Sequence, residues 1–119
     1  MTMDIIEGQA REITYQPATE AVAEDFLASL DVAESSKDTY TRSLRQFISW
    51  LDDTGRQSLQ LQREDILAYK SYLKAQLSVY TVNQYLTAVR KLYQWLESQK
   101  IYPDITRGIK GLKKPEGYR

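Results

Sequence analysis

The chain has 119 residues, enough for one domain with a modest core. It contains neither cysteine nor histidine, which excludes disulfide scaffolds, thiol nucleophiles, histidine acid–base chemistry and the usual zinc sites. No apolar run reaches the roughly 18 residues required to span a bilayer, and the N-terminus lacks the basic and apolar blocks of a signal peptide, so we expect a cytoplasmic protein with no membrane partner.

The net charge is zero, but the charges are divided unevenly along the chain. Residues 1–34 hold eight acids and one base, Arg11, so this part carries a charge of minus seven and the remainder carries plus seven. A basic C-terminal part favours a polyanionic partner, although charged segments of this kind also serve only to keep a chain in solution.

The first two predicted elements are an arm and a helix. Residues 1–18 contain Gly8 and Pro17 and show no sustained apolar period, so we expect a flexible acidic arm. Apolar residues then recur every three or four positions over about 19–30, which predicts a short helix. A second helix is predicted over about 37–53, with Ser36 as its N-cap and Gly55 as its left-handed stop.

Two further helices and a tail follow. A third helix opens at Glu64 and Asp65, and we expect its inner face to hold Ile66, Tyr69, Leu73 and Leu77. Ser78 is the expected N-cap of a long fourth helix that ends near Lys100. Beyond it, prolines and glycines interrupt a basic tail, residues 103–119, which we interpret as a linker towards a further domain. The pattern predicts an all-α fold of four helices.

The fourth helix separates its residues most clearly into two faces. Val82, Leu86, Val89, Tyr93 and Leu96 lie on one side at helical spacing. The opposite face holds cations, amides and hydroxyls but no carboxylate: Asn83, Thr87, Arg90, Lys91, Gln94 and Ser98. A solvated face usually mixes acids with bases, so this face indicates contact with phosphates and base edges.

Other candidate DNA contacts lie at helix starts and on the second helix. Ser36 with Thr39, and Ser78 with Thr81, place two hydroxyls beside free backbone amides, where they can hold a phosphate or act only as caps. Arg42 and Arg45 project from the outer face of the second helix. If the second and fourth helices cross, their polar faces form one basic surface; otherwise both are solvated.

No catalytic site is predicted within these residues. Adjacent carboxylates such as Glu64 and Asp65 point about 100° apart on a helix and cannot share one small site. The sequence has no glycine-rich phosphate loop, nucleophile elbow or plausible general base. We therefore expect no catalytic residue, no metal site, no cofactor and no small-molecule substrate.

Cap residues and apolar spacings over three of the helices resemble the core-binding domain of tyrosine recombinases, the family that includes phage and transposon integrases and Xer-type recombinases. The resemblance covers about 19–115 and rests on Thr39, Tyr40, Leu44, Phe47, Trp50, Leu51, Asp65, Ile66, Tyr69, Leu73, Ser78, Thr81, Val82, Asn83, Leu86, Val89, Arg90, Leu92 and Tyr93. It implies a compact SAM-like four-helix bundle over 19–102, preceded by the arm, 1–18, and followed by the basic linker, 103–119.

The resemblance also implies a function. Such a bundle forms one half of a clamp around duplex DNA, and the second and fourth helices face the DNA. The implied partners are double-stranded DNA and other recombinase protomers on it, and the implied parent is a tyrosine site-specific recombinase whose catalytic residues belong to a domain not included here. The expected DNA-binding residues are Lys37, Thr39, Arg42, Arg45, Ser78, Thr81, Asn83, Thr87, Arg90, Lys91, Gln94, Lys110, Lys113 and Lys114.

The leading alternative is a helical protein-interaction module whose basic face meets an acidic partner. Val32, Trp95 or Ile101 would then supply an apolar anchor. An acid-free polar face favours DNA, whereas a docked partner requires an exposed apolar patch. A stand-alone helix-turn-helix regulator would need a shorter recognition helix after a tight turn.

Overall fold

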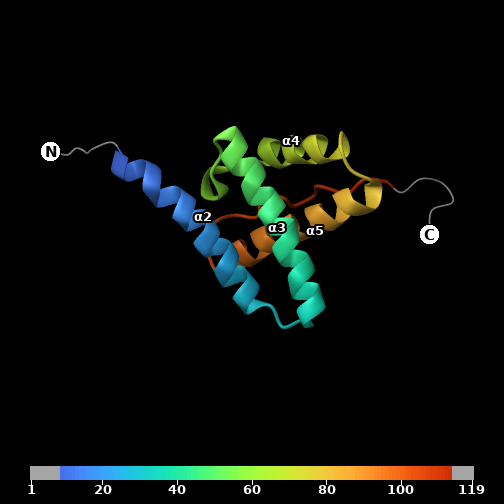
Figure 1. Cartoon of the computed structure of the whole chain (residues 1–119), viewed down its shortest axis with the longest axis horizontal. Helices are drawn as coiled ribbons and strands as arrows, with labels where there is room; N and C mark the ends of the chain where they lie inside the picture. The colour runs from blue at the N-terminus through green and yellow to red at the C-terminus, as the bar shows by residue number, and fades with distance from the viewer. Residues whose placement is uncertain (1–8, 114–119) are drawn as a thin grey trace.

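The computed structural model describes residues 9–113, with side chains from residue 19 onward. Its α-helices are α2 (Gln9–Ser29), α3 (Glu34–Thr54), α4 (Arg63–Lys74) and α5 (Val79–Ser98), and a short 3-10 helix, η1, spans Ser58–Gln60. In Figure 1, α3 crosses α5, and α2 and α4 lie on either side of this crossing. The predicted all-α, compact SAM-like bundle is confirmed. Within residues 9–113 no helix is long and apolar enough to cross a membrane.

The core forms around α5, whose predicted apolar stripe is buried along its whole length. The stripe packs against one face of α3 and one face of α4. The buried residues are Val82, Leu86, Ala88, Val89, Leu92, Tyr93 and Leu96 on α5, Leu44, Phe47, Trp50 and Leu51 on α3, and Ile66, Tyr69 and Leu73 on α4. Full burial of a leucine or phenylalanine side chain contributes about 1.5–3 kcal/mol, so this packing stabilises the crossing of α3 and α5.

Aromatic rings fill the centre of the core. The ring of Phe47 lies 5.1 Å from that of Tyr69 and 6.3 Å from that of Tyr93, edge to face in both pairs. The hydroxyl of Tyr93 donates a hydrogen bond to the carbonyl oxygen of Ser58 at 2.6 Å, which ties α5 to η1. Burial raises the pKa of Tyr69 and of Tyr93 well above the ordinary tyrosine value, so both hydroxyls stay neutral.

Three helix ends follow local capping chemistry. Ser78 is the N-cap of α5, as predicted, and its Oγ accepts a hydrogen bond from the backbone N–H of Thr81 at 3.2 Å. Gly55 ends α3 with φ of 70°, also as predicted. At the start of α4, the backbone N–H of Gln62 donates to Oδ2 of Asp65 at 2.7 Å. Leu77 was expected on the inner face of this helix, but α4 ends at Lys74 and Leu77 is exposed.

Two predicted helix starts are wrong. The first helix, α2, begins at Gln9 and continues through Pro17, so residues 9–18 of the expected arm are helical. A proline inside a helix removes one N–H and crowds the carbonyl four residues earlier, at a cost of about 3 kcal/mol, so the helix over residues 9–18 depends on continuity with the packed residues that follow. The next helix, α3, begins at Glu34 with Ala33 as its N-cap, so Ser36 lies inside the helix. Glu34 favours the earlier start because an acid stabilises the positive end of the helix dipole.

The C-terminal residues pack against the bundle. After α5 the chain reverses and runs back beside that helix (Figure 1). Thr106 and Ile109 are buried, and Leu112 is half-buried against the core. The described part of the expected linker, residues 103–113, is therefore held on the domain, a feature that the sequence prediction did not include.

Candidate functional site

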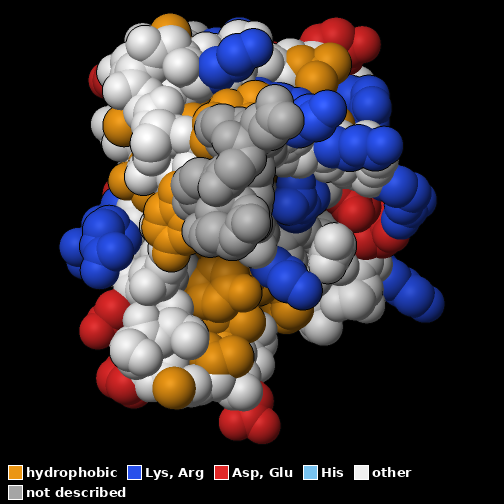
Figure 2. All heavy atoms as spheres, turned by 90° about the vertical axis from the view of Figure 1, so that its right-hand side faces the viewer, with side chains coloured by type: hydrophobic (Ala, Val, Ile, Leu, Met, Phe, Trp, Pro, Cys, Tyr) orange, Lys and Arg blue, Asp and Glu red, His pale blue; other side chains and the backbone are white. Residues whose placement is uncertain are grey.

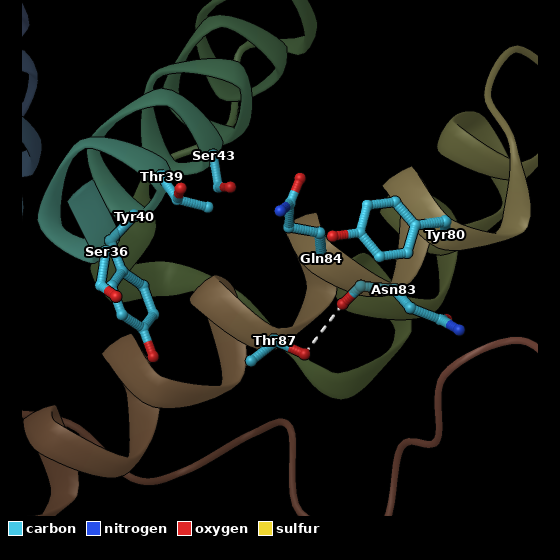
Figure 3. A pocket seen from close by; sticks show the side chains of 8 residues that line it. All are labelled: Ser36, Thr39, Tyr40, Ser43, Tyr80, Asn83, Gln84 and Thr87. Atoms are coloured by element: carbon cyan, nitrogen blue, oxygen red, sulfur yellow. Dashed lines mark hydrogen bonds between the residues drawn. The ribbon is translucent and has the colours of Figure 1, made fainter. Parts of the chain in front are cut away.

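A groove of about 480 Å³ lies between the N-terminal halves of α3 and α5. Figure 3 shows its lining side chains, which come from both helices. They are Ser36, Thr39, Tyr40 and Ser43 from α3, and Tyr80, Asn83, Gln84 and Thr87 from α5. Every one of them carries a hydroxyl or an amide group. Of the candidate contacts named from the sequence, the groove brings together Ser36, Thr39, Asn83 and Thr87.

Two groups that the sequence analysis missed face this groove without a partner. Ser43 is buried, and its Oγ makes no hydrogen bond within the described residues. Gln84 points from α5 into the gap between the helices (Figure 3). A buried polar group normally has a hydrogen-bond partner, so the unpaired Ser43 hydroxyl is an exception beneath the groove. Tyr80, at 60% exposure, lies beside them at the start of α5.

The two predicted threonines in the groove donate their hydroxyl protons to their own helices. Thr39 Oγ1 donates to the carbonyl oxygen of Ser35 at 3.2 Å, and Thr87 Oγ1 donates to that of Asn83 at 2.8 Å. Their oxygens retain lone pairs, so each threonine is able to accept a further hydrogen bond but not to donate one.

Asn83 and Arg90, expected to face DNA, bind the C-terminal residues of the same chain. Asn83 Nδ2 donates to the carbonyl oxygen of Leu112 at 3.0 Å, and the N–H of Leu112 donates to Asn83 Oδ1 at 2.6 Å. Figure 3 shows the Asn83 amide pointing away from the gap. Arg90 Nη1 donates to the carbonyl oxygen of Ile109 at 3.3 Å. Both side chains thus have partners within the domain.

Ser78 and Thr81 form a capping pair at the start of α5. The Ser78 Oγ lies 3.1 Å from the Thr81 Oγ1, in addition to the bond that it accepts from the Thr81 N–H. This geometry agrees with the capping interpretation of the motif. The hydroxyl of Ser78 is exposed, beside the free amides of the first turn of α5.

The two arginines expected to share a basic surface with α5 lie on different parts of α3. Arg45 lines a second hollow, of about 240 Å³, between α2 and α3, together with Glu20 and Glu24. At about 100° per residue, Arg42 lies about 60° from Thr39 around α3, and Arg45 lies about 120° from it in the same direction. Arg42 is therefore nearer the groove face than Arg45.

None of the other predicted contact residues lines the groove within the described residues. Lys37 is half-buried on α3, whereas Lys91 and Gln94 are exposed on α5 and Lys110 and Lys113 are exposed on the C-terminal segment. Lys114 lies outside the described residues. On the face at the right of Figure 1, Lys and Arg side chains gather on one side, next to a band of hydrophobic ones (Figure 2). Among residues 9–113 no group of acidic side chains is arranged to hold a metal ion.

Comparison with known proteins identifies the family of this domain. The family model described as phage integrase, N-terminal SAM-like domain, matches residues 23–100, which include α3, α4 and α5 and thus both walls of the groove. Neither the curated proteins nor the solved structures provided a match. The family match supports an integrase or tyrosine recombinase role in DNA recombination and integration. With 78 of its 119 residues matched, the chain belongs to the family of N-terminal SAM-like domains of phage integrases.

Proposed function

We propose that this domain binds duplex DNA as the core-binding half of a tyrosine recombinase or integrase, with the α3/α5 groove facing the DNA. The observation that carries the proposal is the lining of the groove, in which each of the eight side chains is neutral and bears a hydroxyl or an amide. Groups of this kind with a free hydrogen donate to phosphate oxygens, and free acceptors such as the hydroxyl oxygens of Thr39 and Thr87 accept from the amino groups of bases.

Exposed cations beside the groove provide the electrostatic part of binding. Arg42 on α3, Lys91 on α5, and Lys110 and Lys113 on the C-terminal segment are all exposed. Each phosphate that such a side chain neutralises releases counterions, which makes the affinity fall steeply with salt. These residues would bind any duplex, whatever its sequence.

Gln84 is the best placed residue for reading a base. Its amide points into the gap and makes no hydrogen bond within the described residues, so its donors and its acceptor are all available. A glutamine amide recognises adenine by donating to N7 and accepting from N6 in the major groove. Asn83 and Arg90, by contrast, bind the main chain of Leu112 and Ile109.

The proposed parent protein is a tyrosine site-specific recombinase. Within it this domain positions DNA, and the catalytic residues belong to another domain. Duplex DNA and neighbouring recombinase protomers on that DNA are the proposed partners, with the cytoplasm as the proposed location. No catalytic residue, metal or cofactor is proposed for these 119 residues.

The protein-interaction alternative has less support. Trp95, one of its expected anchors, is half-buried and packs against Phe26, with 5.9 Å between the ring centroids. Val32 and Ile101 are exposed, at 43% and 47%, but single exposed apolar side chains are ordinary on protein surfaces. The acid-free groove has no role in this alternative.

The test is a salt titration with a matched pair of arginine variants on α3. Binding of a labelled mixed-sequence duplex is followed by fluorescence anisotropy at several salt concentrations for the wild type, Arg42→Ala and Arg45→Ala. We expect Arg42→Ala to weaken binding and to reduce the slope of log affinity against log salt by about 0.9, because one phosphate contact is lost. Arg45→Ala should match the wild type because Arg45 faces α2.

Two results would count against the proposal. If Arg45→Ala weakens binding as much as Arg42→Ala, the groove side of α3 does not face the DNA. If the wild type binds no duplex even at low salt, duplex binding by this domain is wrong and the protein-interaction alternative takes its place.

A further inference from the structure

Side chains of α4 and α5 hold residues 107–113, here termed the strap, by its main chain. Arg63 Nη1 donates to the carbonyl oxygen of Arg107 at 2.6 Å, and Lys70 Nζ donates to that of Lys110 at 2.6 Å. Arg90 and Asn83 add the bonds to Ile109 and Leu112 described above. Because these donors bind main-chain atoms, the side chains of Lys110 and Lys113 remain exposed.

The two hydrogen bonds between Asn83 and Leu112, here termed the amide bridge, close a ring in which one side-chain amide pairs with one main-chain unit. The pairing resembles that of two residues in neighbouring β-strands. Both polar atoms of the Asn83 side chain are thereby used, at 3.0 and 2.6 Å. The amide bridge joins residues that are 29 positions apart in the sequence.

Gly111 permits the strap to approach Asn83 closely enough for this bridge. A Cβ atom at position 111 would lie 2.5 Å from Oδ1 of Asn83 and 3.0 Å from its Cγ, closer than van der Waals contact allows. Any other residue at position 111 would therefore displace the Asn83 amide. The bridge between Asn83 and Leu112 therefore requires a residue without a Cβ atom at position 111.

We propose that the amide bridge and Gly111 order the strap at the edge of the groove, so that Lys110 and Lys113 meet the DNA as fixed cations. Asn83 is then a positioning residue, which acts on DNA binding through the strap and does not itself read a base. This inference rests on the proposed function, since it requires the groove to face a polyanion.

The position and the order of the strap both support this role. Asn83 lines the groove from α5 and holds Leu112 with an amide that points away from the gap, so the strap lies behind the Asn83 edge of the groove. A segment that is already ordered loses less conformational entropy on binding than a free one. The buried side chain of Ile109 fixes the same segment from its inner side.

The experiment is a double-mutant cycle on DNA binding. Asn83→Ala, Gly111→Ala and the double variant are titrated with two duplexes of unrelated sequence, and hydrogen exchange of the strap amides is measured in the free proteins. We expect each single variant to weaken binding by about tenfold on both duplexes, with a smaller salt slope and faster exchange of the strap. The double variant should be no weaker than the single variants, because both changes break the same bridge.

A second variant removes the charges of the strap without changing its packing, so a loss of DNA affinity in this variant does not come from unfolding. Lys110→Gln with Lys113→Gln removes the exposed cations but leaves the main-chain bonds of the strap in place. This variant should weaken DNA binding about as much as Gly111→Ala does, while hydrogen exchange of the strap amides stays as in the wild type. Adding Gly111→Ala to it should cause little further loss of DNA affinity.

Other outcomes overturn the inference in different ways. If Gly111→Ala binds like the wild type while Asn83→Ala is weaker on one duplex only, Asn83 reads a base directly. If Gly111→Ala binds more tightly than the wild type, the strap competes with DNA. If the Lys110 and Lys113 changes leave affinity unaltered, the strap does not meet the DNA. If the wild type binds neither duplex, the proposed function fails and the inference fails with it.

Discussion

The hydroxyl of Tyr93 and the carbonyl oxygen of Ser58 are joined by a hydrogen bond of 2.6 Å in the buried core, whereas the neighbouring hydroxyl of Tyr69 has no partner within the described residues. Both tyrosine side chains are fully buried. The two residues therefore provide a matched pair, in which the same chemical change removes a satisfied hydroxyl from one and an unsatisfied hydroxyl from the other.

Tyr93→Phe should destabilise the domain by about 1–3 kcal/mol, because it leaves the buried carbonyl of Ser58 without a donor. Tyr69→Phe should be neutral or stabilising, since the hydroxyl that it removes is buried without a partner. Urea unfolding followed by circular dichroism measures both changes. Equal losses of stability in the two variants would show that the bond between Tyr93 and Ser58 contributes nothing specific.

The Asp65 carboxylate predicts a dependence of stability on acid pH. Burial by itself raises its pKa, but hydrogen bonds from Arg56 Nε at 2.8 Å and from the Gln62 N–H at 2.7 Å outweigh burial and hold the pKa below its ordinary value of 3.8. Because the folded-state pKa is the lower one, this contribution is fully present above the ordinary value and is lost as the pH falls through the folded-state pKa.

Asp65→Asn should therefore be less stable than the wild type near neutral pH and should lose less stability on acidification. Thermal unfolding at a series of pH values from about 6 to about 3 compares the two proteins over this range. If the two curves stay parallel throughout, the bonds from Arg56 and Gln62 do not lower the pKa of Asp65 enough to matter.

Replacing Ser36 and replacing Ser78, the first residues of the two Ser-x-x-Thr motifs, should affect stability differently. Ser78→Ala should cost about 1 kcal/mol, because it removes the N-cap of α5. Ser36→Ala should change stability by less than about 0.5 kcal/mol, because Ser36 is exposed within α3, where alanine is a better helix former. Chemical unfolding of each variant distinguishes them, and a larger loss at Ser36 than at Ser78 would contradict the helix start at Glu34.

Much of the fold was predictable because it depends on local patterns. The stripe of α5, the stop at Gly55 and the cap at Ser78 each follow from residues within one or two turns of each other. The start of α2 was not predictable, since the apolar period is weak over residues 9–18 and Pro17 indicates a break. The helix there depends on continuity with the packed residues that follow.

The site was only partly predictable. The polar face of α5 indicated one of the two helices that line the groove, but the residues of that face separate in three dimensions. Asn83 and Arg90 turn to the strap, whereas Gln84, which the helical pattern did not single out, faces α3. These outcomes depend on how α3 crosses α5 and on contacts with residues 109–112. The glycines and lysines of the C-terminal tail show no helix or strand periodicity, so the sequence does not predict that this tail packs on α5.

The most direct test of the central claim, that the α3/α5 groove faces DNA, uses the absence of cysteine from the chain. Gln84→Cys places a single thiol in the groove. Asp53→Cys places one on the exposed far end of α3, about 15 Å along the helix from Ser43 at 1.5 Å per residue. The rate of alkylation of each thiol is measured without DNA and with saturating duplex. We predict that duplex slows the reaction at position 84 and leaves that at position 53 unchanged; an unchanged rate at position 84 while the protein is bound to DNA would contradict the account.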